Sequence, residues 1–302
     1  MAELSPEGAP ILVTGGSGQL ATSLARLGGG RVHRVGRPDF DFDRPDTIAD
    51  VFAALKPAAV VNAAAWTAVD AAETEIEAVT RANRDGPARL AALCARAGIP
   101  LLHVSTDYVF DGDKGTPYVE TDPISPTGVY GRTKAEGEQA ALEANPRTIV
   151  LRTAWVYSAT GKNFVRTMIN AGEKNPTLRV VGDQCGAPTA SDDLASAILG
   201  ILARIETQGW QDSYAGIYHA AGTGEATWHG LAVAALEAAQ KHGRSMPDVI
   251  AIRTADWPTP ARRPADSRLD CGKLERVFGI RLPPWRKSLI RTVDELLAPS
   301  PS

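Results

Sequence analysis

The residues best suited to chemistry are Tyr130 and Lys134, which lie four positions apart in a segment with helical spacing. Side chains at i and i+4 share one face of a helix, so both should point the same way. Thr106 lies at the end of a buried apolar segment that predicts a strand. Reducing a ketone needs a proton donor, and a free tyrosine, with a pKa of about 10, matches neutral pH poorly. A nearby lysine lowers that pKa and a hydroxyl orients the carbonyl, so the three residues predict carbonyl reduction.

A glycine-rich turn follows the first predicted strand, residues 10–14, and opens the first predicted helix. Gly15 permits a tight turn, Gly18 lets the backbone approach a pyrophosphate, and Ala21 allows the helix to pack closely on the sheet. The helix N-terminus adds N–H donors and the positive end of its dipole. The turn therefore predicts a dinucleotide site that uses Gly15, Gly18, Gln19 and Leu20.

The end of the second predicted strand bears on the choice of cofactor. An acidic residue there favours NAD, because it accepts a hydrogen bond from the ribose 2′-hydroxyl. This sequence has Gly36 and Arg37 instead, and a guanidinium suits a 2′-phosphate. NADPH is therefore favoured over NADH, with a solvated surface charge as the simpler interpretation of Arg37. Asp41 and Phe42 are expected at the adenine edge.

Short apolar segments alternate with amphipathic ones along the chain, which predicts an α/β fold with a Rossmann-type, doubly wound parallel sheet. The predicted strands are 10–14, 31–35, 58–62, 100–105, 148–152 and 216–219. The predicted helices are one ending at Leu27, 45–55, 127–144, 191–205 and 287–297, together with a helix-rich segment over 71–97.

After Val156 the pattern is less regular. Residues 1–180, completed by about 190–220, are expected to form the dinucleotide-binding domain. Residues 221–302, with about 181–189, are expected to form a smaller C-terminal α/β substrate-binding lobe. Within it, residues 252–269 hold three prolines and predict irregular structure, and the tail 299–302 is expected to be disordered.

Composition narrows the class of protein. The 302 residues are 44% hydrophobic and carry a net charge of −3, without a basic stripe, so nucleic acid is not an expected partner. No apolar run reaches the roughly 20 residues needed to cross a bilayer, and the polar N-terminus does not resemble a signal peptide. Cys94, Cys185 and Cys271 lie far apart, which favours a reducing cytoplasm and neither disulfides nor zinc.

Seven segments together resemble the extended short-chain dehydrogenase/reductase superfamily, and within it the dTDP-4-dehydrorhamnose reductase family. They span nearly the whole chain, so their combination is more specific than any single motif. They are Gly15–Ala21, Val60–Glu73, Ser105–Gly112, Pro126–Glu138, Arg152–Ser158, Asp183–Thr189 and Thr259–Asp270.

The resemblance implies an NAD(P)H-dependent reduction of the C4 ketone of dTDP-6-deoxy-L-lyxo-4-hexulose to dTDP-L-rhamnose. It makes Thr106, Tyr130 and Lys134 catalytic, with Tyr130 as the proton donor and Lys134 on the nicotinamide ribose. It also implies a loop under the cofactor and a set of residues around the substrate. The loop is Ala63, Ala64 and Ala65, and the substrate residues are Thr67, Val69, Thr106, Asp107, Trp155, Asn163 and Arg263. Core packing of Trp155 and a surface ion pair of Arg263 are the simpler interpretations of those two.

Some members of the family are described as dimers bridged by Mg²⁺ through glutamates, one of them in the first helix. This sequence has Ser23 there, and loss of a carboxylate weakens a site for a hard cation. No metal site is therefore carried over. Asp192 and Glu295 are candidates for comparable acidic positions, with solvated helix charges as the favoured interpretation. The use of Mg²⁺ and the formation of a homodimer stay open.

Two other interpretations share these motifs. A sugar-nucleotide epimerase or dehydratase has the same fold, but a dehydratase carries Asp-Glu after the strand-end threonine, where this sequence has Asp107 and Tyr108. A different sugar-nucleotide reductase is also compatible. A non-catalytic NADP-binding regulatory subunit needs no complete set of Thr106, Tyr130 and Lys134, so the intact set argues against it.

Overall fold

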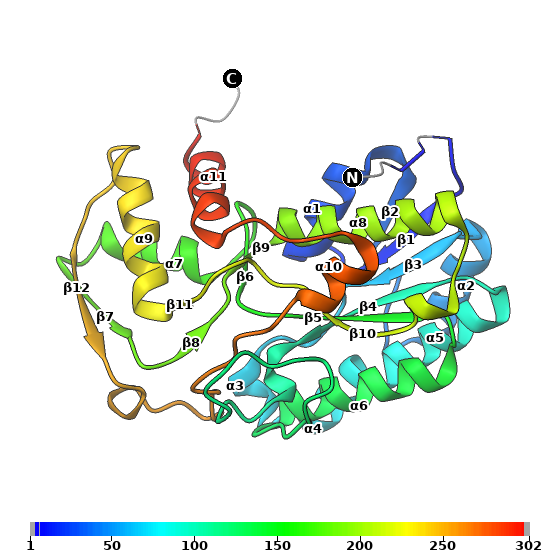
Figure 1. The fold of residues 1–302 in the computed structure, drawn as a ribbon, viewed down its shortest axis with the longest axis horizontal. Helices are drawn as coiled ribbons and strands as arrows, with labels where there is room; N and C mark the ends of the chain where they lie inside the picture. The colour runs from blue at the N-terminus through cyan, green and yellow to red at the C-terminus, as the bar shows by residue number, and fades with distance from the viewer. Residues whose placement is uncertain (1–3, 6, 299–302) are drawn as a thin grey trace.

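The computed structural model describes residues 4–5 and 7–298, with a six-stranded parallel sheet at the centre (Figure 1). The strand order is β2-β1-β3-β4-β5-β10. The strands are β1 (Ile11–Thr14), β2 (Val32–Val35), β3 (Ala59–Asn62), β4 (Leu101–Thr106), β5 (Thr148–Thr153) and β10 (Gly216–His219). Their ends differ from the predicted ends by at most one residue, so the Rossmann-type α/β prediction is confirmed.

Helices cover both faces of the sheet. Alternate residues of each strand point to opposite faces, and both sets are apolar here, so each face packs against helices. Val13 of β1 packs in a cluster with Leu24 and Ile198, whereas its neighbour Leu12 packs in another with Leu90. Figure 1 shows α1 and α8 above the sheet and α5 and α6 below it. The helices of this half are α1 (Gln19–Gly28), α2 (Pro45–Leu55), α5 (Gly86–Ala97), α6 (Val129–Ala144), α8 (Ser191–Gln208) and α10 (Gly272–Phe278). Short 3₁₀ turns are η1 (Gly29–Arg31), η3 (Asp107–Val109) and η4 (Asp212–Tyr214).

The helix-rich segment predicted over 71–97 is broken into pieces. Short helices α3 (Val69–Ala72) and α4 (Ile76–Thr80) lead into a π-helical turn, η2 (Arg81–Asp85), before α5. The wider turn brings the carbonyl of Asn83 so close to α6 that a Cβ on Gly137 would lie 2.0 Å from it. Gly137 therefore allows η2 to touch the helix that carries Tyr130 and Lys134.

A second, smaller body lies beside one end of the sheet (Figure 1). Its core joins α7 to α9 and α9 to α11, and β7 pairs in parallel with β12. Its elements are α7 (Phe164–Gly172), β7 (Thr177–Val181), α9 (Trp228–Gln240), β12 (Asp248–Ile252) and α11 (Trp285–Leu297). Two short strand pairs lie at its junction with the sheet: β6 (Val156–Tyr157) with β9 (Thr189–Ala190), and β8 (Cys185–Gly186) with β11 (Ala226–Thr227).

The lobe boundary expected near residue 180 stays a prediction, and β7, which precedes it, pairs with β12 from far along the chain. Residues 253–269 form only one short turn, η5 (Thr254–Asp256), which confirms the irregular structure predicted there. The tail 299–302, predicted to be disordered, lies outside the described residues. Within the part of the chain that the structure describes, every helix is too short or too polar to cross a bilayer.

Candidate active site

One cavity of about 940 Å³ opens at the carboxyl ends of β1, β3 and β4 and reaches the smaller lobe. In doubly wound sheets, ligands bind at the point where the strand order reverses, which here lies between β1 and β3. The lining runs from the glycine turn at Gly15 to Trp228 of α9. It therefore contains both the predicted cofactor turn and the predicted reducing residues.

The glycine turn is shaped by backbone that other residues tolerate poorly. Gly15 and Gly16 have φ of +110° and +53°, and the Gly18 N–H donates to the Gly15 carbonyl over 2.9 Å. A Cβ on Gly36, after β2, would lie 2.5 Å from the Cα of Gly16. Helix α1 then begins at Gln19 with no side-chain cap, which leaves its first N–H groups free to donate to a ligand.

All predicted cofactor residues line this cavity. Arg37 lies after β2, and Asp41 and Phe42 follow it. The Phe42 ring packs so closely on Gly86 that a Cβ there would lie 2.5 Å from it. An aromatic ring and a cation thus line the part of the cavity that follows β2. The complete set is Gly15, Gly18, Gln19, Leu20, Arg37, Asp41, Phe42, Ala63, Ala64, Ala65, Tyr130 and Lys134.

A buried network fixes the loop after β3. The Thr14 hydroxyl donates to the side-chain oxygen of Asn62 over 2.6 Å and accepts from the Ala64 N–H over 3.1 Å. The Asn62 amide contacts Nδ1 of His103 at 3.0 Å. Burial holds the pKa of His103 well below its usual range, so this imidazole is neutral. The network places Ala63 to Ala65 against the glycine turn, because Ala63 lies 3.0 Å from where a Gly15 Cβ would be.

Thr106, Tyr130 and Lys134 meet in the cavity as the spacing predicted. Thr106 ends β4, and its hydroxyl lies near the Tyr130 phenol. Lys134 lies one helical turn beyond Tyr130, is 2% exposed, and donates from Nζ to the Val104 carbonyl over 2.6 Å. The Tyr130 ring meets that of Tyr108 edge-on, with centroids 5.5 Å apart.

The electrostatics of the pair differ from the sequence-based expectation. Burial raises the pKa of Tyr130 to about 12, against the hydrogen bond from Thr106, which lowers it. Burial also lowers the pKa of Lys134 to about 8, and the nearby Glu138 carboxylate acts in the opposite direction. The predicted lowering of the Tyr130 pKa by Lys134 is therefore wrong for the structure without ligands, because desolvation dominates. Tyr130 stays a neutral phenol that holds its proton at neutral pH.

Asp107 is a buried carboxyl group directly beside this pair. Its Oδ1 lies 3.0 Å from the Thr106 hydroxyl oxygen, and its Oδ2 is buried without a hydrogen-bond partner. Burial raises the pKa of Asp107 to about 6, while the nearby Ser267 and Thr106 hydroxyls act in the opposite direction. Burial therefore favours the protonated form of this carboxyl group.

Two stacked indoles form the other end of the cavity. Trp155 has a φ of +48°, unusual for a bulky residue, and its ring lies 3.6 Å from that of Trp228 at an interplanar angle of 8°. Gly186 makes room, since a Cβ there would lie 2.4 Å from the Trp155 indole. The Trp228 indole N–H donates to Gln184 over 3.1 Å. The predicted substrate residues Thr67, Val69, Thr106, Asp107 and Trp155 all line the cavity.

Asn163 and Arg263 are not among the residues that line the cavity. Asn163 caps α7, where its Oδ1 accepts from the Arg166 N–H over 3.1 Å and its Nδ2 donates to the Ser158 carbonyl over 2.8 Å. Arg263 pairs with Asp70 at 2.8 Å. Both side chains are thus held by protein groups, and their contact with a ligand stays a prediction.

Comparison with known proteins shows which family the chain belongs to. A family model described as the RmlD substrate binding domain matches residues 9–298. A dTDP-4-dehydrorhamnose reductase of Sinorhizobium fredii is 45% identical over 289 residues, which are 95% of this chain and 97% of that protein. The chain belongs to the RmlD family. A dTDP-4-dehydrorhamnose reductase of Bacillus anthracis, solved in complex with NADP, matches with a TM-score of 0.87 and 29% identity, over 98% of this chain and 100% of that one.

A further relative shows that similar reductases are named for different sugar substrates. It is a probable dTDP-4,6-dihydroxy-2-methyloxan-3-one 4-ketoreductase of Streptomyces antibioticus, 39% identical over 95% of each chain. Within the RmlD family, then, similar chains are named as ketoreductases of different dTDP-linked sugars. The chain is an oxidoreductase, and its exact sugar has to be argued from the site.

In this RmlD-family chain, the region expected to lack a metal site is filled by protein contacts. Ser23 lies 2.8 Å from Ser191 across α1 and α8, and Asp192 forms an ion pair with Arg26. Glu295 is exposed. Within residues 4–5 and 7–298, no group of three or more His, Cys, Asp or Glu side chains could hold a metal ion.

The structure adds two residues that the sequence did not reveal. Trp228 stacks on Trp155 from a helix more than 70 positions away, and a lone tryptophan carries no sequence signal for such a contact. Asn83, in η2, accepts from the Trp66 N–H over 2.8 Å and donates to the Trp66 carbonyl over 3.2 Å. It also lies 3.3 Å from Thr133 of α6, so it links the loop after β3 to the helix of Tyr130 and Lys134.

Proposed function

We propose that this protein uses NADPH to reduce the C4 ketone of dTDP-6-deoxy-L-lyxo-4-hexulose to dTDP-L-rhamnose. The observation that carries the proposal is the meeting of Thr106, Tyr130 and Lys134 in the cavity that the glycine turn opens. The substrate is supported by relatives that match nearly the whole chain and are named dTDP-4-dehydrorhamnose reductases. The glycine turn suits a dinucleotide, because Cβ atoms at Gly15 and Gly36 would press on the backbone of Ala63 and Gly16 and open the tight turn.

NADPH supplies the hydride when it is bound, and the protein supplies position and the proton. Tyr130 gives its phenolic proton to the oxygen at C4 as negative charge develops there. Thr106 donates a hydrogen bond to the same oxygen and orients the carbonyl. Lys134, fixed by the Val104 carbonyl, holds the nicotinamide ribose and offsets the charge left on Tyr130.

The remaining predicted contacts divide between the two ends of the cavity. Arg37 binds the 2′-phosphate that distinguishes NADPH from NADH. Thr67, Val69 and the Trp155 indole surround the sugar, and the substrate diphosphate reaches the rim near Arg263 and Asn163. Arg263 would then exchange part of its ion pair with Asp70 for the diphosphate, which a guanidinium binds with two parallel hydrogen bonds.

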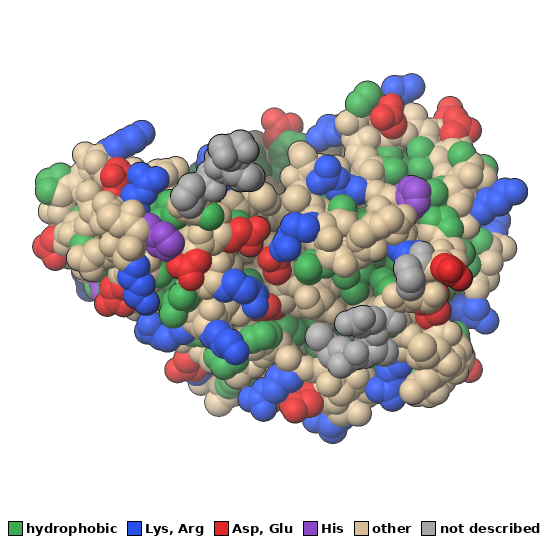
Figure 2. Space-filling model, turned by 90° about the horizontal axis from the view of Figure 1, so that it is seen from above, with side chains coloured by type: hydrophobic (Ala, Val, Ile, Leu, Met, Phe, Trp, Pro, Cys, Tyr) green, Lys and Arg blue, Asp and Glu red, His purple; other side chains and the backbone are tan. Residues whose placement is uncertain are grey.

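We also infer a cytoplasmic location and no nucleic-acid partner. Among the described residues all three cysteines are free thiols, and Figure 2 shows acidic and basic side chains interspersed on the face in view. The division into a dinucleotide-binding domain and a C-terminal substrate lobe belongs to the same proposal. The two bodies in Figure 1 support it, as does a cavity lined by residues of both.

The test is an assay with freshly prepared dTDP-6-deoxy-L-lyxo-4-hexulose, in which NADPH oxidation is followed by absorbance and the product by NMR. The proposal predicts stoichiometric oxidation with dTDP-L-rhamnose as product. Binding of NADPH without oxidation would overturn it and favour the regulatory-subunit interpretation. A product with another configuration at C4, or turnover only with another dTDP-linked keto-sugar, would favour the ketoreductase alternative that the Streptomyces antibioticus relative represents.

A further inference from the structure

Asp107 combines burial, an incomplete set of hydrogen bonds and direct contact with Thr106. The residue is 2% exposed and follows β4 in the turn η3. Its Oδ1 accepts from the Thr106 hydroxyl over 3.0 Å when the carboxyl group is ionised, and its Oδ2 has no partner. A buried carboxylate oxygen without a partner is costly, whereas a protonated carboxyl group bears less charge to desolvate.

The protonation state of Asp107 decides which group accepts the hydrogen bond from the Thr106 hydroxyl. The Thr106 oxygen accepts from the Tyr108 N–H over 3.2 Å, and its hydroxyl has a single hydrogen to donate. If Asp107 is ionised, that hydrogen points at Oδ1 and none is left for a substrate carbonyl. If Asp107 is protonated, it donates to the second lone pair of Thr106, and the threonine hydrogen is free to point into the cavity, towards the Tyr130 phenol and a substrate carbonyl.

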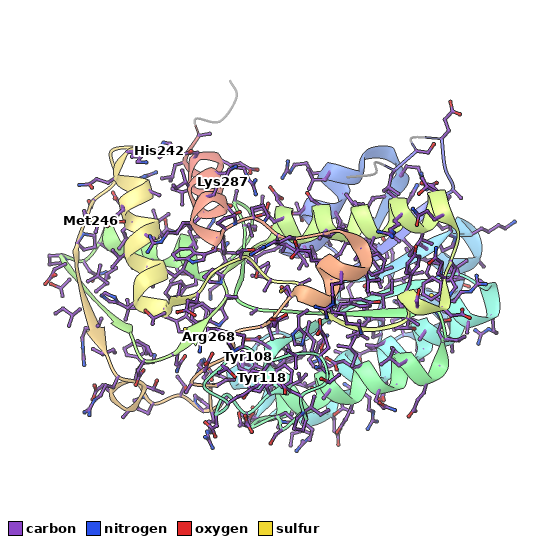
Figure 3. All side chains as sticks on the ribbon, in the orientation of Figure 1. Tyr108, Tyr118, His242, Met246, Arg268 and Lys287 are labelled. Atoms are coloured by element: carbon purple, nitrogen blue, oxygen red, sulfur yellow. The ribbon has the colours of Figure 1, made fainter. Side chains whose placement is uncertain are left out.

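The groups around Asp107 favour the protonated state. Tyr108 of its own turn, Tyr130 of α6 and Ser267 of the C-terminal loop face it, and all three are uncharged at neutral pH. The cations nearby are engaged elsewhere: Arg263 acts on Tyr108 and pairs with Asp70, and Lys134 donates to Val104. Figure 3 shows Tyr108 where the two lobes meet, so a ligand between them excludes water from this corner.

Binding of the proposed ligands shifts the balance further. Burial already raises the pKa of Asp107 to about 6. The phosphates of NADPH and of a nucleotide sugar bring negative charge into the same cavity, and like charges disfavour an ionised carboxylate. In the complex this added negative charge therefore raises the pKa of Asp107 further.

We propose that Asp107 is a positioning residue that works in its protonated form, donating to Thr106 so that the Thr106 hydroxyl donates to the substrate carbonyl. This inference rests on the proposed function, in which Thr106 orients the ketone. Asp107 keeps its proton throughout: the new C–H bond at C4 takes the hydride of NADPH, and the new O–H bond takes the proton of Tyr130. A neutral Asp107 also avoids placing a second negative charge beside the oxygen as it becomes an alkoxide.

The test compares the pH dependence of kcat in the wild type and in Asp107→Asn, which keeps the shape, stays neutral and still has N–H donors. A primary isotope effect with deuterated NADPH is measured alongside, to establish that hydride transfer limits the rate. In the wild type, kcat falls by about tenfold per pH unit above the pKa of Asp107 in the complex. In Asp107→Asn that fall is absent below the pH at which Lys134, with a pKa of about 8, loses its own charge. One unit above the pKa of Asp107 the variant is therefore roughly tenfold faster than the wild type.

Two more variants separate the effect of a hydrogen-bond donor at position 107 from the effect of removing its charge. Asp107→Leu is neutral without a donor, so it is slower than Asp107→Asn at every pH and shows no fall in the same range. Asp113→Asn removes an exposed carboxylate outside the cavity and keeps the wild-type profile. The inference is overturned if Asp107→Asn keeps the wild-type fall, or if it binds NADPH but loses activity at every pH, because the carboxylate itself would then be needed.

A spectroscopic readout keeps the inference apart from the proposed function. In the NADPH complex at pH 7, infrared difference spectra should show the carbonyl band of a protonated carboxyl group that Asp107→Asn lacks. A missing band overturns the inference even if the wild type reduces the keto-sugar. Failure of the wild type to reduce that sugar, with the band present, overturns the proposed function and leaves the state of Asp107 established.

Discussion

The proposed chemistry of this site depends on single residues, and their types and spacing indicated three of them. Tyr130 and Lys134 could be paired from helix periodicity alone, and Thr106 from its place at a strand end. Their protonation states could not be predicted in this way. The pKa of Tyr130 rises to about 12 because the phenol is buried, and burial depends on segments distant in the sequence. The roles of Trp228 and Asn83 could not be predicted either, because their contacts also join segments distant in the sequence.

Cofactor preference is a prediction at this scale. Arg37→Ala removes the guanidinium expected at the 2′-phosphate, so the KM for NADPH should rise by about tenfold or more while that for NADH changes little. Steady-state kinetics with both cofactors measures the ratio. Arg34→Ala is a suitable control, because Arg34 bonds the Thr22 side chain and does not line the cavity. An unchanged ratio in Arg37→Ala would remove Arg37 from the choice of cofactor.

The stability of the protein should report on Asp107 without any substrate. The folded-state pKa of about 6 exceeds the unfolded value of 3.8, so the folded state binds more protons between these pH values. Stability contributed by protonated Asp107 is present below pH 4 and is lost as pH rises through 6. Asp107→Asn should therefore gain about 1–3 kcal/mol relative to the wild type at pH 7.5, and nothing near pH 4. Urea unfolding at both pH values measures this, and an equal difference at both would contradict the account.

At the scale of elements, the central sheet and the last helix, α11, could be predicted, and the strands of the smaller lobe could not. The strands of the sheet are short, continuous apolar runs between clear turns, such as Ala59–Asn62. In the smaller lobe, β7 alternates exposed and buried residues over only five positions, and its partner β12 lies about 70 residues further along. Such strands are stabilised by contacts between distant segments, for which local periodicity gives little warning.

The junction between β2 and the glycine turn carries a prediction about an element. A Cβ on Gly36 would lie 2.5 Å from the Gly16 backbone, so Gly36→Ala should push the turn apart and weaken NADPH binding by at least about tenfold. Fluorescence titration with NADPH measures the Kd. Gly30→Ala, where a Cβ meets no atom within 4 Å, should leave the Kd unchanged. Equal affinities in the two variants would show that the close approach does not shape the cofactor site.

At the scale of the whole molecule, function depends on two bodies that share one cavity. The sheet contributes the glycine turn and the residues Thr106, Tyr130 and Lys134, and the smaller lobe contributes Trp228. Figure 3 shows Arg268 and Tyr118 near the junction of these bodies, where the Tyr118 N–H donates to the Arg268 carbonyl over 2.8 Å. The sequence predicted that a second lobe exists, because irregular structure follows the last regular strand–helix units. It did not predict how that lobe closes the cavity.

The most direct test of the central claim follows a single hydride. NADPH that carries deuterium at its transferable position is mixed with dTDP-6-deoxy-L-lyxo-4-hexulose and either the wild type or Tyr130→Phe, and the sugar is analysed by NMR. The account predicts deuterium at C4 of dTDP-L-rhamnose with the wild type. It predicts a rate at least about 10²-fold lower with Tyr130→Phe, which still binds NADPH. Deuterium at another carbon, or equal rates for the two proteins, would contradict it.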